Sequence, residues 1–254
     1  MQFVDVHAHL DFPEFKDLDT LIPQWKSAGV KAVISNGVHA ESNRKILELA
    51  KTHDIIKPAL GFYPVHAVEV SEEDFDKELE FIQKQQPIAL GEVGLDYSSG
   101  DDNPFGDDKK KEMKACFEKI IRLAEKKRIP LMVHSRKAEF DVVDMLESSS
   151  TKKIVMHCFM GKKSLAKRIV DNGWYTSIPC IIVRSQQFQD MIGMQHLSKL
   201  LTETDAPYLS PFKDGKPNQP SNIIETIKKI AELKGMDQEE VANNLFKNYQ
   251  DLFL

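Results

Sequence analysis

The chain has 254 residues, of which 41% are hydrophobic and 29% charged, a balance that excludes a disordered chain and indicates a globular protein with a sizeable core. Its formal charge of −5 argues mildly against a nucleic-acid partner unless positive charge is locally concentrated. No apolar run approaches the roughly 18 residues that span a bilayer, and the N-terminus lacks the features of a signal peptide. The three cysteines form no CxxC pair. We therefore expect a cytoplasmic protein with no membrane contact and no obligate protein partner.

Short apolar runs rich in β-branched residues recur along the chain and predict eight strands. In chain order these are residues 2–6, 31–35, 55–60, 88–91, 130–133, 153–156, 174–178 and 197–201. Stretches with helical spacing of apolar residues alternate with them and predict helices over 18–28, 42–52, 72–84, 107–127, 138–147, 163–172, 184–194 and 222–234. The last strand is the least distinct, since the periodicity of 197–201 also fits a helix.

Eight strand and helix repeats in a chain of this length fit an α/β fold, the closed (β/α)8 TIM barrel, whose usual length is ~250 residues. An open doubly wound sheet is the alternative. No Pro- or Gly-rich linker divides the sequence, so we expect one domain over residues 1–254. Residues 237–251 open with Asp237, a favoured helix N-cap, and predict an extra closing helix at the C-terminus. The polar stretch 98–111 is interpreted as a solvated loop or as a mobile lid.

Six side chains that can bind metal ions stand at the end of a predicted strand or just after one. They are His7, His9, Glu92, His134, His157 and Asp205. In a barrel of this type, catalytic residues come from these strand ends. Nitrogen and carboxylate ligands without thiolate suit zinc, manganese, magnesium or iron, and six ligands exceed the three that are typical of one catalytic zinc. We therefore predict two divalent metal ions, with Glu92 as the bridging candidate and Asp205 as the candidate general base.

Six sequence segments carry a resemblance to a known family. They are DVHAHLD (5–11), GEVGLDY (91–97), HSRKA (134–138), HCFMG (157–161), ETDAPYL (203–209) and PNQPSN (217–222). Taken together and in this order, they resemble the successive motifs of the TatD-related deoxyribonucleases. The likeness extends over nearly the whole chain. It implies a metal-dependent phosphodiesterase of the amidohydrolase superfamily with a (β/α)8 fold.

The resemblance also implies roles for individual residues. By analogy, one metal ion would be held by His7, His9, Asp205 and Glu92, and the other by His134, His157 and the bridging Glu92. Arg136 resembles an arginine of the family, and its guanidinium fork matches phosphate oxygens, with a surface salt bridge as the alternative. Glu203 also matches the family pattern, either as an orienting partner of Asp205 or as a ligand.

The sequence departs from the family pattern at two places. Many members have a histidine before a proline after the third strand, whereas this chain has Tyr63 before Pro64. The hydroxyl of Tyr63 could contact the substrate, and His66 could replace the missing imidazole or be an exposed loop histidine. Near PNQPSN the family usually has an arginine, and Lys213 or Lys216 occupies that region here. This predicts looser recognition of the substrate there.

Other polar residues have simpler interpretations. Three further histidines are expected to be structural or solvated: His39, His53 and His196. Cys158 is not expected to be a nucleophile, because strand alternation points it away from the side of His157. A basic cluster follows the sixth predicted strand and is either a solvated helix face or a clamp for a nucleic-acid backbone. It consists of Lys162, Lys163, Lys167 and Arg168.

The favoured interpretation is a deoxyribonuclease that hydrolyses DNA phosphodiester bonds. Two metal ions would activate water, Asp205 would accept its proton, and Arg136 would stabilise the developing charge. A metal pair serves attack on a carbonyl equally well, so a hydrolase of C–N or carboxyl-ester bonds, such as a deacylase of misacylated tRNA, is an alternative. A metal-binding scaffold without turnover is another. Tyr63 is its only hint, and the presence of all six candidate ligands argues against it.

Overall fold

The computed structural model describes residues 1–98 and 105–254, and its centre is a sheet of eight parallel strands in chain order. They are β1 (Phe3–Ala8), β2 (Val30–Asn36), β3 (Ile56–Leu60), β4 (Ala89–Asp96), β5 (Leu131–Arg136), β6 (Ile154–His157), β7 (Tyr175–Pro179) and β8 (Leu200–Glu203). The chain after β8 meets the end of β1 through a parallel bridge between Ala8 and Ala206, where the backbone N–H of His9 donates to the carbonyl of Ala206 over 2.8 Å. The sheet therefore curls into the predicted (β/α)8 barrel.

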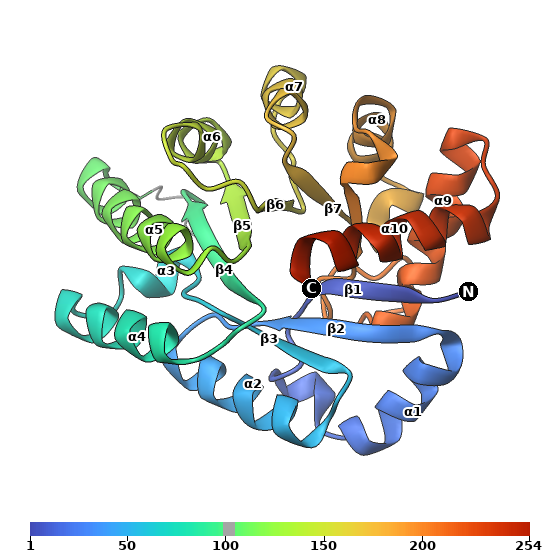
Figure 1. The fold of residues 1–254 in the computed structure, drawn as a ribbon, viewed down its shortest axis with the longest axis horizontal. Helices are drawn as coiled ribbons and strands as arrows, with labels where there is room; N and C mark the ends of the chain where they lie inside the picture. Colours follow the sequence, from blue (N-terminus) through green and yellow to red (C-terminus); the bar gives the residue numbers. More distant parts are fainter. Residues whose placement is uncertain (99–104) are drawn as a thin grey trace.

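Helices form an outer ring around the strands (Figure 1). They are α1 (Leu18–Ala28), α2 (Ala40–Thr52), α3 (Pro64–Ala67), α4 (Glu72–Lys84), α5 (Asp107–Lys127), α6 (Glu139–Glu147), α7 (Lys163–Asp171), α8 (Gln186–Met194), α9 (Ile223–Lys234) and α10 (Gln238–Phe253). In the described ranges, no helix combines the length and the apolar character that crossing a membrane requires.

Most element boundaries agree with the sequence prediction, and the differences have local causes. The helix α1 begins after Asp17, whose carboxylate accepts from the N–H of Thr20, and ends at Gly29, which has a φ of +111°. The strand predicted at 197–201 is wrong at its start, because Leu197–Lys199 forms a 3-10 turn. The strand β4 continues to Asp96, beyond the predicted residue 91, because glycines interrupt the apolar run that marked it. The single turn α3 was not predicted, since it is too short for a periodicity.

A separate apolar core fills the interior of the barrel. Its members are Val4, Val6, Ala32, Ile34, Ala59, Ala89, Met132, Val155, Leu201, Tyr249 and Leu252. Tyr249 and Leu252 come from α10, and Asn248 of the same helix donates to the carbonyls of Leu197 and Leu200 over 2.7 and 2.8 Å. Because Leu200 begins β8, α10 closes the N-terminal end of the barrel, as the extra helix was predicted to do.

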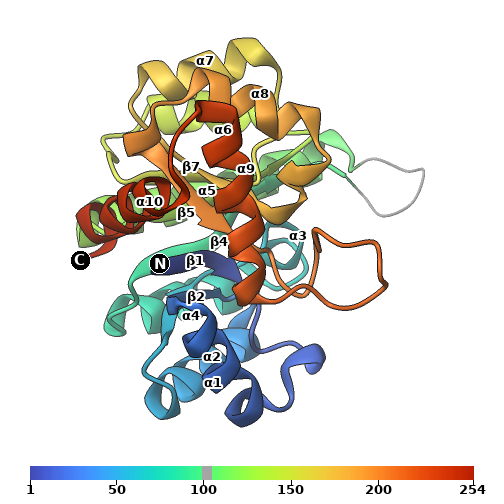
Figure 2. The same ribbon diagram turned by 90° about the vertical axis from the view of Figure 1, so that its right-hand side faces the viewer.

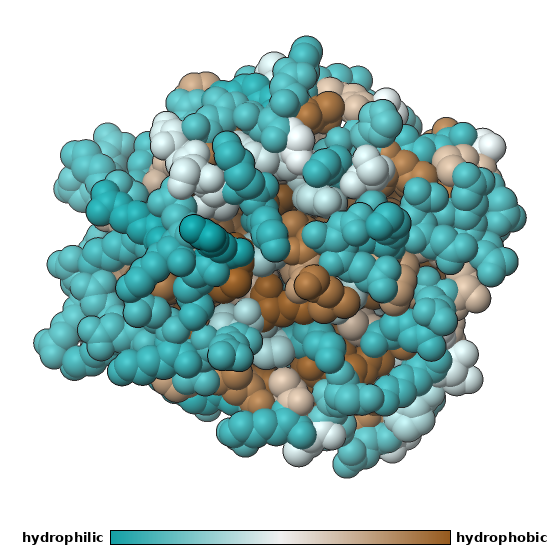
Figure 3. All heavy atoms as spheres, in the orientation of Figure 1, coloured by the Kyte–Doolittle hydropathy of each residue, from teal (hydrophilic) through white to brown (hydrophobic). Residues whose placement is uncertain are grey.

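The two ends of the barrel face opposite sides of the molecule. Figure 2 shows α10 and both chain termini at one end and the loop that follows β8 at the other. Figure 3 shows the closed end, where apolar side chains gather near the centre of the face and hydrophilic ones surround them. The open end is therefore the one at which the strands finish, and the predicted ligands belong there.

Candidate metal centre

The structure brings the six predicted ligands together at the open end of the barrel. Five of them line a cavity of about 470 Å³: His9, Glu92, His134, His157 and Asp205. The sixth, His7, is fully buried beside them. The register of β1 against β2 shifts between Asp5 and Ala8, which marks a β-bulge. This extra residue lets Val6 pack inside the barrel while the neighbouring His7 also reaches the cluster.

One carboxylate oxygen of Glu92, Oε2, faces the two histidines at the end of β1. It lies 3.5 Å from Nε2 of His7 and 3.5 Å from Nε2 of His9. Oδ1 of Asp205 lies 3.7 Å and 3.4 Å from the same two nitrogens. Ligand atoms bound at ~2.1 Å to one tetrahedral ion lie ~3.4 Å apart, so these four separations fit a shared ion. The carbonyl of Asn36, 3.1 Å from Nδ1 of His9, leaves Nε2 of His9 for the cluster.

His7 gives the strongest sign that this group suits a cation. Both of its ring nitrogens are buried, and neither has a hydrogen-bond partner among the residues that the structure describes. A buried polar atom without a partner costs about 1–3 kcal/mol, so native proteins rarely keep one without a reason. The Nε2 atom of His7 faces two carboxylates, and a cation held between them would satisfy all three groups.

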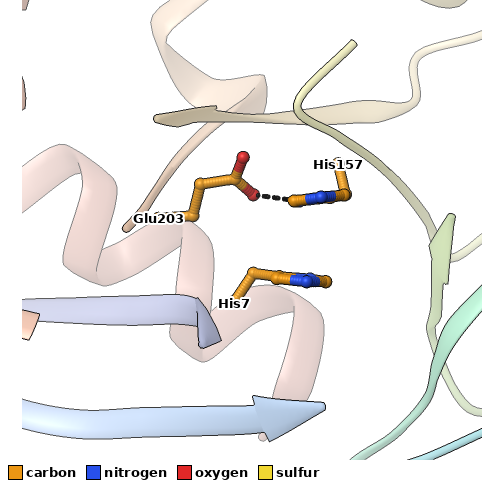
Figure 4. A group of neighbouring side chains, drawn as sticks. All are labelled: His7, His157 and Glu203. Atoms are coloured by element: carbon orange, nitrogen blue, oxygen red, sulfur yellow. Dashed lines mark hydrogen bonds and ion pairs between the residues drawn. The ribbon is translucent and has the colours of Figure 1, made fainter. Parts of the chain in front are cut away.

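The other oxygen of Glu92, Oε1, faces a second pair of histidines. It lies 2.8 Å from Nδ1 of His134 and 3.9 Å from Nε2 of His157. Figure 4 shows the ring of His157 over that of His7, and the two centroids are 3.6 Å apart. Nδ1 of His157 points instead to Oε2 of Glu203, 2.8 Å away, so its Nε2 is turned toward Glu92. Glu92 thus stands between two histidine pairs.

Glu203 contacts His157 rather than Asp205, the partner that the sequence suggested. Its carboxylate lies against Nδ1 of His157 and accepts a hydrogen bond from the hydroxyl of Ser177. The alternative prediction, that Glu203 is a metal ligand, agrees with its position, since His7, His157 and Glu203 form a group that could hold an ion. Glu203 is fully buried. A carboxylate behind a histidine fixes the tautomer and the orientation of the ring. Glu203 therefore acts on the second histidine pair rather than on Asp205.

Two backbone features allow the ligands to approach one another. Gly94 has a φ of +139°, and a Cβ placed on it would lie 2.0 Å from the carbonyl oxygen of His134, so only glycine fits between β4 and β5 there. Asp205 has a φ of +56°, a left-handed conformation that Asp tolerates better than most residues. Its N–H donates to the carbonyl of His7 over 2.9 Å, which ties the end of β8 to β1.

The burial of the cluster shifts its titrating groups in ways that favour a bound cation. Burial and the neighbouring His157 lower the pKa of His7 to about 4, so this imidazole is neutral at pH 7 and able to bind metal. Burial alone would raise the pKa of Glu92, but the neighbouring imidazoles of His134 and His7 hold it well below its usual range. Glu92 is therefore an anion among imidazoles.

The second pair of histidines is shifted the opposite way. Burial lowers the pKa of His134, but contacts with Asp96 and Glu92 outweigh burial and raise it to about 9. Glu203 likewise outweighs burial and raises the pKa of His157 to about 9. Each ring therefore holds a second proton at pH 7 unless a metal ion displaces it.

The three predicted substrate contacts, Tyr63, His66 and Arg136, line the same cavity. Arg136 is exposed, and its guanidinium has no hydrogen bond or ion pair with any residue in 1–98 or 105–254. Nδ1 of His66 lies 3.0 Å from the carbonyl of Val38 and donates to it, and its Nε2 has no hydrogen-bond partner in the part of the chain that the structure describes. The hydroxyl of Tyr63 donates to Asp96 and is thus engaged with the protein.

Asp96, which was not predicted from the sequence, lies behind the second histidine pair. Its Oδ2 lies 3.3 Å from Nε2 of His134, and its Oδ1 accepts from the N–H of Ser98 over 2.7 Å. Hydrogen bonds from His134, Ser98 and Tyr63 outweigh burial and lower the pKa of Asp96 to about 2. Alternation along β4 was the available signal, since Glu92, Gly94 and Asp96 share one side.

Comparison with known proteins decides the family. A family model described as TatD related DNase matches residues 4–254. Deoxyribonuclease TATDN3 of Homo sapiens is 34% identical, over 98% of this chain and 94% of the relative. The uncharacterized metal-dependent hydrolase YabD of Bacillus subtilis is 31% identical over 98% of each chain. The crystal structure of YjjV, a TatD homolog from Escherichia coli, has a TM-score of 0.88 at 28% identity and covers 99% of this chain and 97% of that one. The chain belongs to the TatD-related DNase family.

Membership in the TatD family confirms the resemblance of the motifs and makes this chain a metal-dependent hydrolase. The family's fold agrees with the observed barrel. Three residues of the basic cluster form a solvated helix face, because Lys163, Lys167 and Arg168 pair with carboxylates over 2.6 to 2.8 Å. Lys162 has no ion pair within the described ranges.

The remaining predictions have mixed outcomes in this TatD-family chain. Lys213 and Lys216 are exposed and do not line the 470 Å³ cavity. Burial and nearby carboxylates raise the pKa of Cys158, so it is a protonated thiol and a poor nucleophile, as expected. His39 is structural, since its Nδ1 accepts from the N–H of Ser42 and caps α2. Residues 99–104 of the predicted loop or lid lie outside the described residues.

Proposed function

We propose that this chain is a deoxyribonuclease that hydrolyses DNA phosphodiester bonds in the 470 Å³ cavity, with two divalent metal ions as cofactors, zinc, magnesium or manganese. The observation that carries the proposal is the placement of Glu92, whose two oxygens face separate histidine pairs. The name of the human relative, a deoxyribonuclease, supports DNA as the substrate. The names of the bacterial relatives support dependence on metal.

The six candidate ligands divide into two sets around Glu92. One ion would be held by His7, His9, Asp205 and Oε2 of Glu92, and the other by His134, His157 and Oε1 of Glu92. When bound, such a pair activates water and neutralises charge on the phosphate. Asp96 and Glu203 would orient the rings of His134 and His157, respectively, through the contacts already described.

The protein's own side chains would carry out the remaining steps. A hydrogen bond from His9 outweighs burial and lowers the pKa of Asp205, so at pH 7 its carboxylate is ionised and can take a proton from the attacking water. The guanidinium of Arg136, which has no partner among residues 1–98 and 105–254, would bind phosphate oxygens and stabilise the charge that develops there. His66 would contact the substrate through Nε2, and Tyr63 through the edge of its ring, since its hydroxyl is bound to Asp96.

The overall charge of −5 does not oppose this proposal. Two divalent cations would concentrate positive charge at the point where a phosphate must dock, and the local field there matters more than the sum over the surface. DNA binding should therefore depend more on the metal ions than on a broad basic surface. We also propose a cytoplasmic location, which the free thiols of Cys116, Cys158 and Cys180 support.

A metal titration of the wild type and of His7→Ala tests this function. Each protein is stripped with a chelator, reloaded with Zn²⁺, Mg²⁺ or Mn²⁺, and offered single- and double-stranded DNA, RNA, aminoacyl esters and amides. We expect metal-dependent hydrolysis of DNA by the wild type, and fewer bound ions with no hydrolysis for His7→Ala, whose circular dichroism should be unchanged. Hydrolysis of esters or amides without hydrolysis of DNA would refute the nuclease. Metal binding without any hydrolysis would identify a scaffold.

A further inference from the structure

A second cavity lies beside the candidate metal centre on the same end of the barrel. It has a volume of about 590 Å³ and lies among the segments that follow β4, β5 and β6. Its lining includes Tyr97, Lys137, Phe140, Lys162 and Arg168, and we call it the side groove. Arg136 lines the metal-centre cavity and the next residue, Lys137, lines the side groove, so the two are neighbours on one rim.

The side groove presents an aromatic surface to solvent. Phe140, in the first turn of α6, is 59% exposed. The guanidinium of Arg168 lies over its ring, 5.6 Å from the centroid, and the exposed part of the side chain is accessible to a planar group. Exposed aromatic rings beside a catalytic cavity are the usual platforms on which unpaired bases stack.

The charge available in the side groove suits a phosphate. Lys137 and Lys162 are exposed, and neither forms an ion pair with a residue in the described part of the chain. The carboxylate of Asp141, which also lines the groove, is already engaged by Lys114 and by the hydroxyl of Tyr97, each at 2.7 Å. Glu139 has the backbone N–H of Lys137 at 3.2 Å. Among the described residues, the ammonium groups of Lys137 and Lys162 therefore outnumber Glu139, the one carboxylate of the groove that has no ion pair.

We propose that the side groove is a second nucleotide subsite, which holds one nucleotide of the DNA strand next to the phosphodiester bond in the metal centre. The base would stack on Phe140, and its phosphate would lie between Lys137 and Lys162. Arg136 lines the metal-centre cavity next to Lys137 of the side groove, and it would contact the phosphate that links the two nucleotides. This inference rests on the proposed nuclease function and goes beyond it, because it gives the strand a path along the rim.

The test compares a long substrate with one too small to reach the side groove. The long substrate is a 12-nucleotide DNA strand, and the small one is bis(p-nitrophenyl) phosphate, a phosphodiester without bases. Phe140→Ala and Lys162→Ala should each lower kcat/KM for the strand by about tenfold, mainly through KM, since stacking and phosphate contacts are worth that much per nucleotide. Both variants should hydrolyse the small diester like the wild type. Phe140→Trp should keep the wild-type rate on the strand.

The control is Lys51→Ala, which removes the same charge from an exposed lysine on α2. It should change neither rate. Equal losses on both substrates, or no loss on the strand, would overturn the side groove as a subsite while leaving the nuclease intact. A wild type that hydrolyses the small diester but no DNA would overturn the proposed function together with this inference.

Discussion

The two ends of the barrel are built from the same strands but hold opposite kinds of side chain. At the closed end, apolar residues pack on Tyr249 and Leu252 of α10, and burial of apolar surface stabilises the fold by roughly 25 cal/mol per Å². At the open end, histidines and carboxylates are buried, which costs free energy unless each group is paired or binds an ion. Residues that stabilise the fold and residues that carry the chemistry are thus separated along each strand by only a few positions.

The largest effect on activity is expected from Glu92→Gln at the open end. The amide keeps the size of the side chain but removes the charge that stands between the two histidine pairs. Metal ions in such sites stabilise the transition state by several kcal/mol, so we expect kcat/KM to fall roughly a thousandfold. Steady-state rates with saturating metal measure this loss.

The same variant should keep the fold but lower its stability when metal is absent. Glu92 then forms a buried ion pair with His134 over 2.8 Å, and the loss of one partner of such a pair typically costs about 3–5 kcal/mol. Thermal unfolding in the presence of a chelator should therefore give a melting temperature below that of the wild type, with an unchanged circular dichroism spectrum before the transition. An unchanged melting temperature would mean that this pair does not offset the cost of burying charge at the open end.

The converse test is Leu252→Ala at the closed end. Leu252 is 3% exposed and packs against the interior of the barrel, so truncation should lower the free energy of unfolding by about 2–5 kcal/mol. Urea unfolding measures it, with Leu233→Ala as the control, because Leu233 is 40% exposed on α9. At a temperature where Leu252→Ala is fully folded, kcat should match the wild type, and a changed kcat would mean that α10 also shapes the site.

A smaller effect on activity is expected from Glu203→Gln, because Glu203 contacts His157, a proposed metal ligand, rather than the metal itself. Glu203 holds Nδ1 of His157, and the loss of such a partner typically lowers metal affinity by about 10- to 100-fold. Metal titration followed by calorimetry measures the affinity. Because Glu92 and the other histidines remain, excess metal should restore most of the rate. Failure of excess metal to do so would make Glu203 a ligand rather than an orienting residue.

The barrel and the polar residues at its open end could largely be predicted from the sequence, because the patterns that indicate them are local. Strand and helix periodicities predicted the barrel, and histidines or carboxylates at strand ends predicted the six residues that meet. The spacing His7 to His9 and the isolated Glu92 are visible without a structure. Their convergence follows from the barrel itself, since the ends of parallel strands share one face.

What could not be predicted depends on register between strands that are far apart in the sequence. The contact of Glu203 with His157 needs β6, β7 and β8 side by side, and that of Asp96 with His134 needs the shifted register of β4 against β5. The β-bulge in β1 is equally invisible, since no glycine marks it. Long-range pairing thus decides which carboxylate orients which ring.

The smallest expected effect concerns Asp5, the buried carboxyl in β1 that joins this strand to the end of β8. Its Oδ1 accepts from the N–H groups of His7 and Thr204 over 3.1 and 3.0 Å, and its Oδ2 contacts the hydroxyl of Thr204. Burial outweighs these hydrogen bonds and raises the pKa of Asp5 to about 8, from 3.8. At pH 7 this carboxyl group is therefore a neutral acid, unlike the ionised carboxylates of Glu92 and Asp205 at the open end.

Asp5→Asn should accordingly be tolerated, because Asn copies the size and neutrality of the protonated acid. Its stability should match the wild type at a pH below about 4, where Asp5 is protonated in both the folded and the unfolded chain. The sign of the pH dependence follows from the raised pKa. Between pH 4 and 8 the folded chain keeps the Asp5 proton that the unfolded chain has lost, so Asp5 makes the free energy of unfolding fall as pH rises. Urea unfolding at pH 5, 7 and 9 in the presence of a chelator should show that the free energy of unfolding of Asp5→Asn increases relative to that of the wild type as pH rises. If the free energies of unfolding of the two proteins changed in parallel with pH, Asp5 would be ionised in the folded chain.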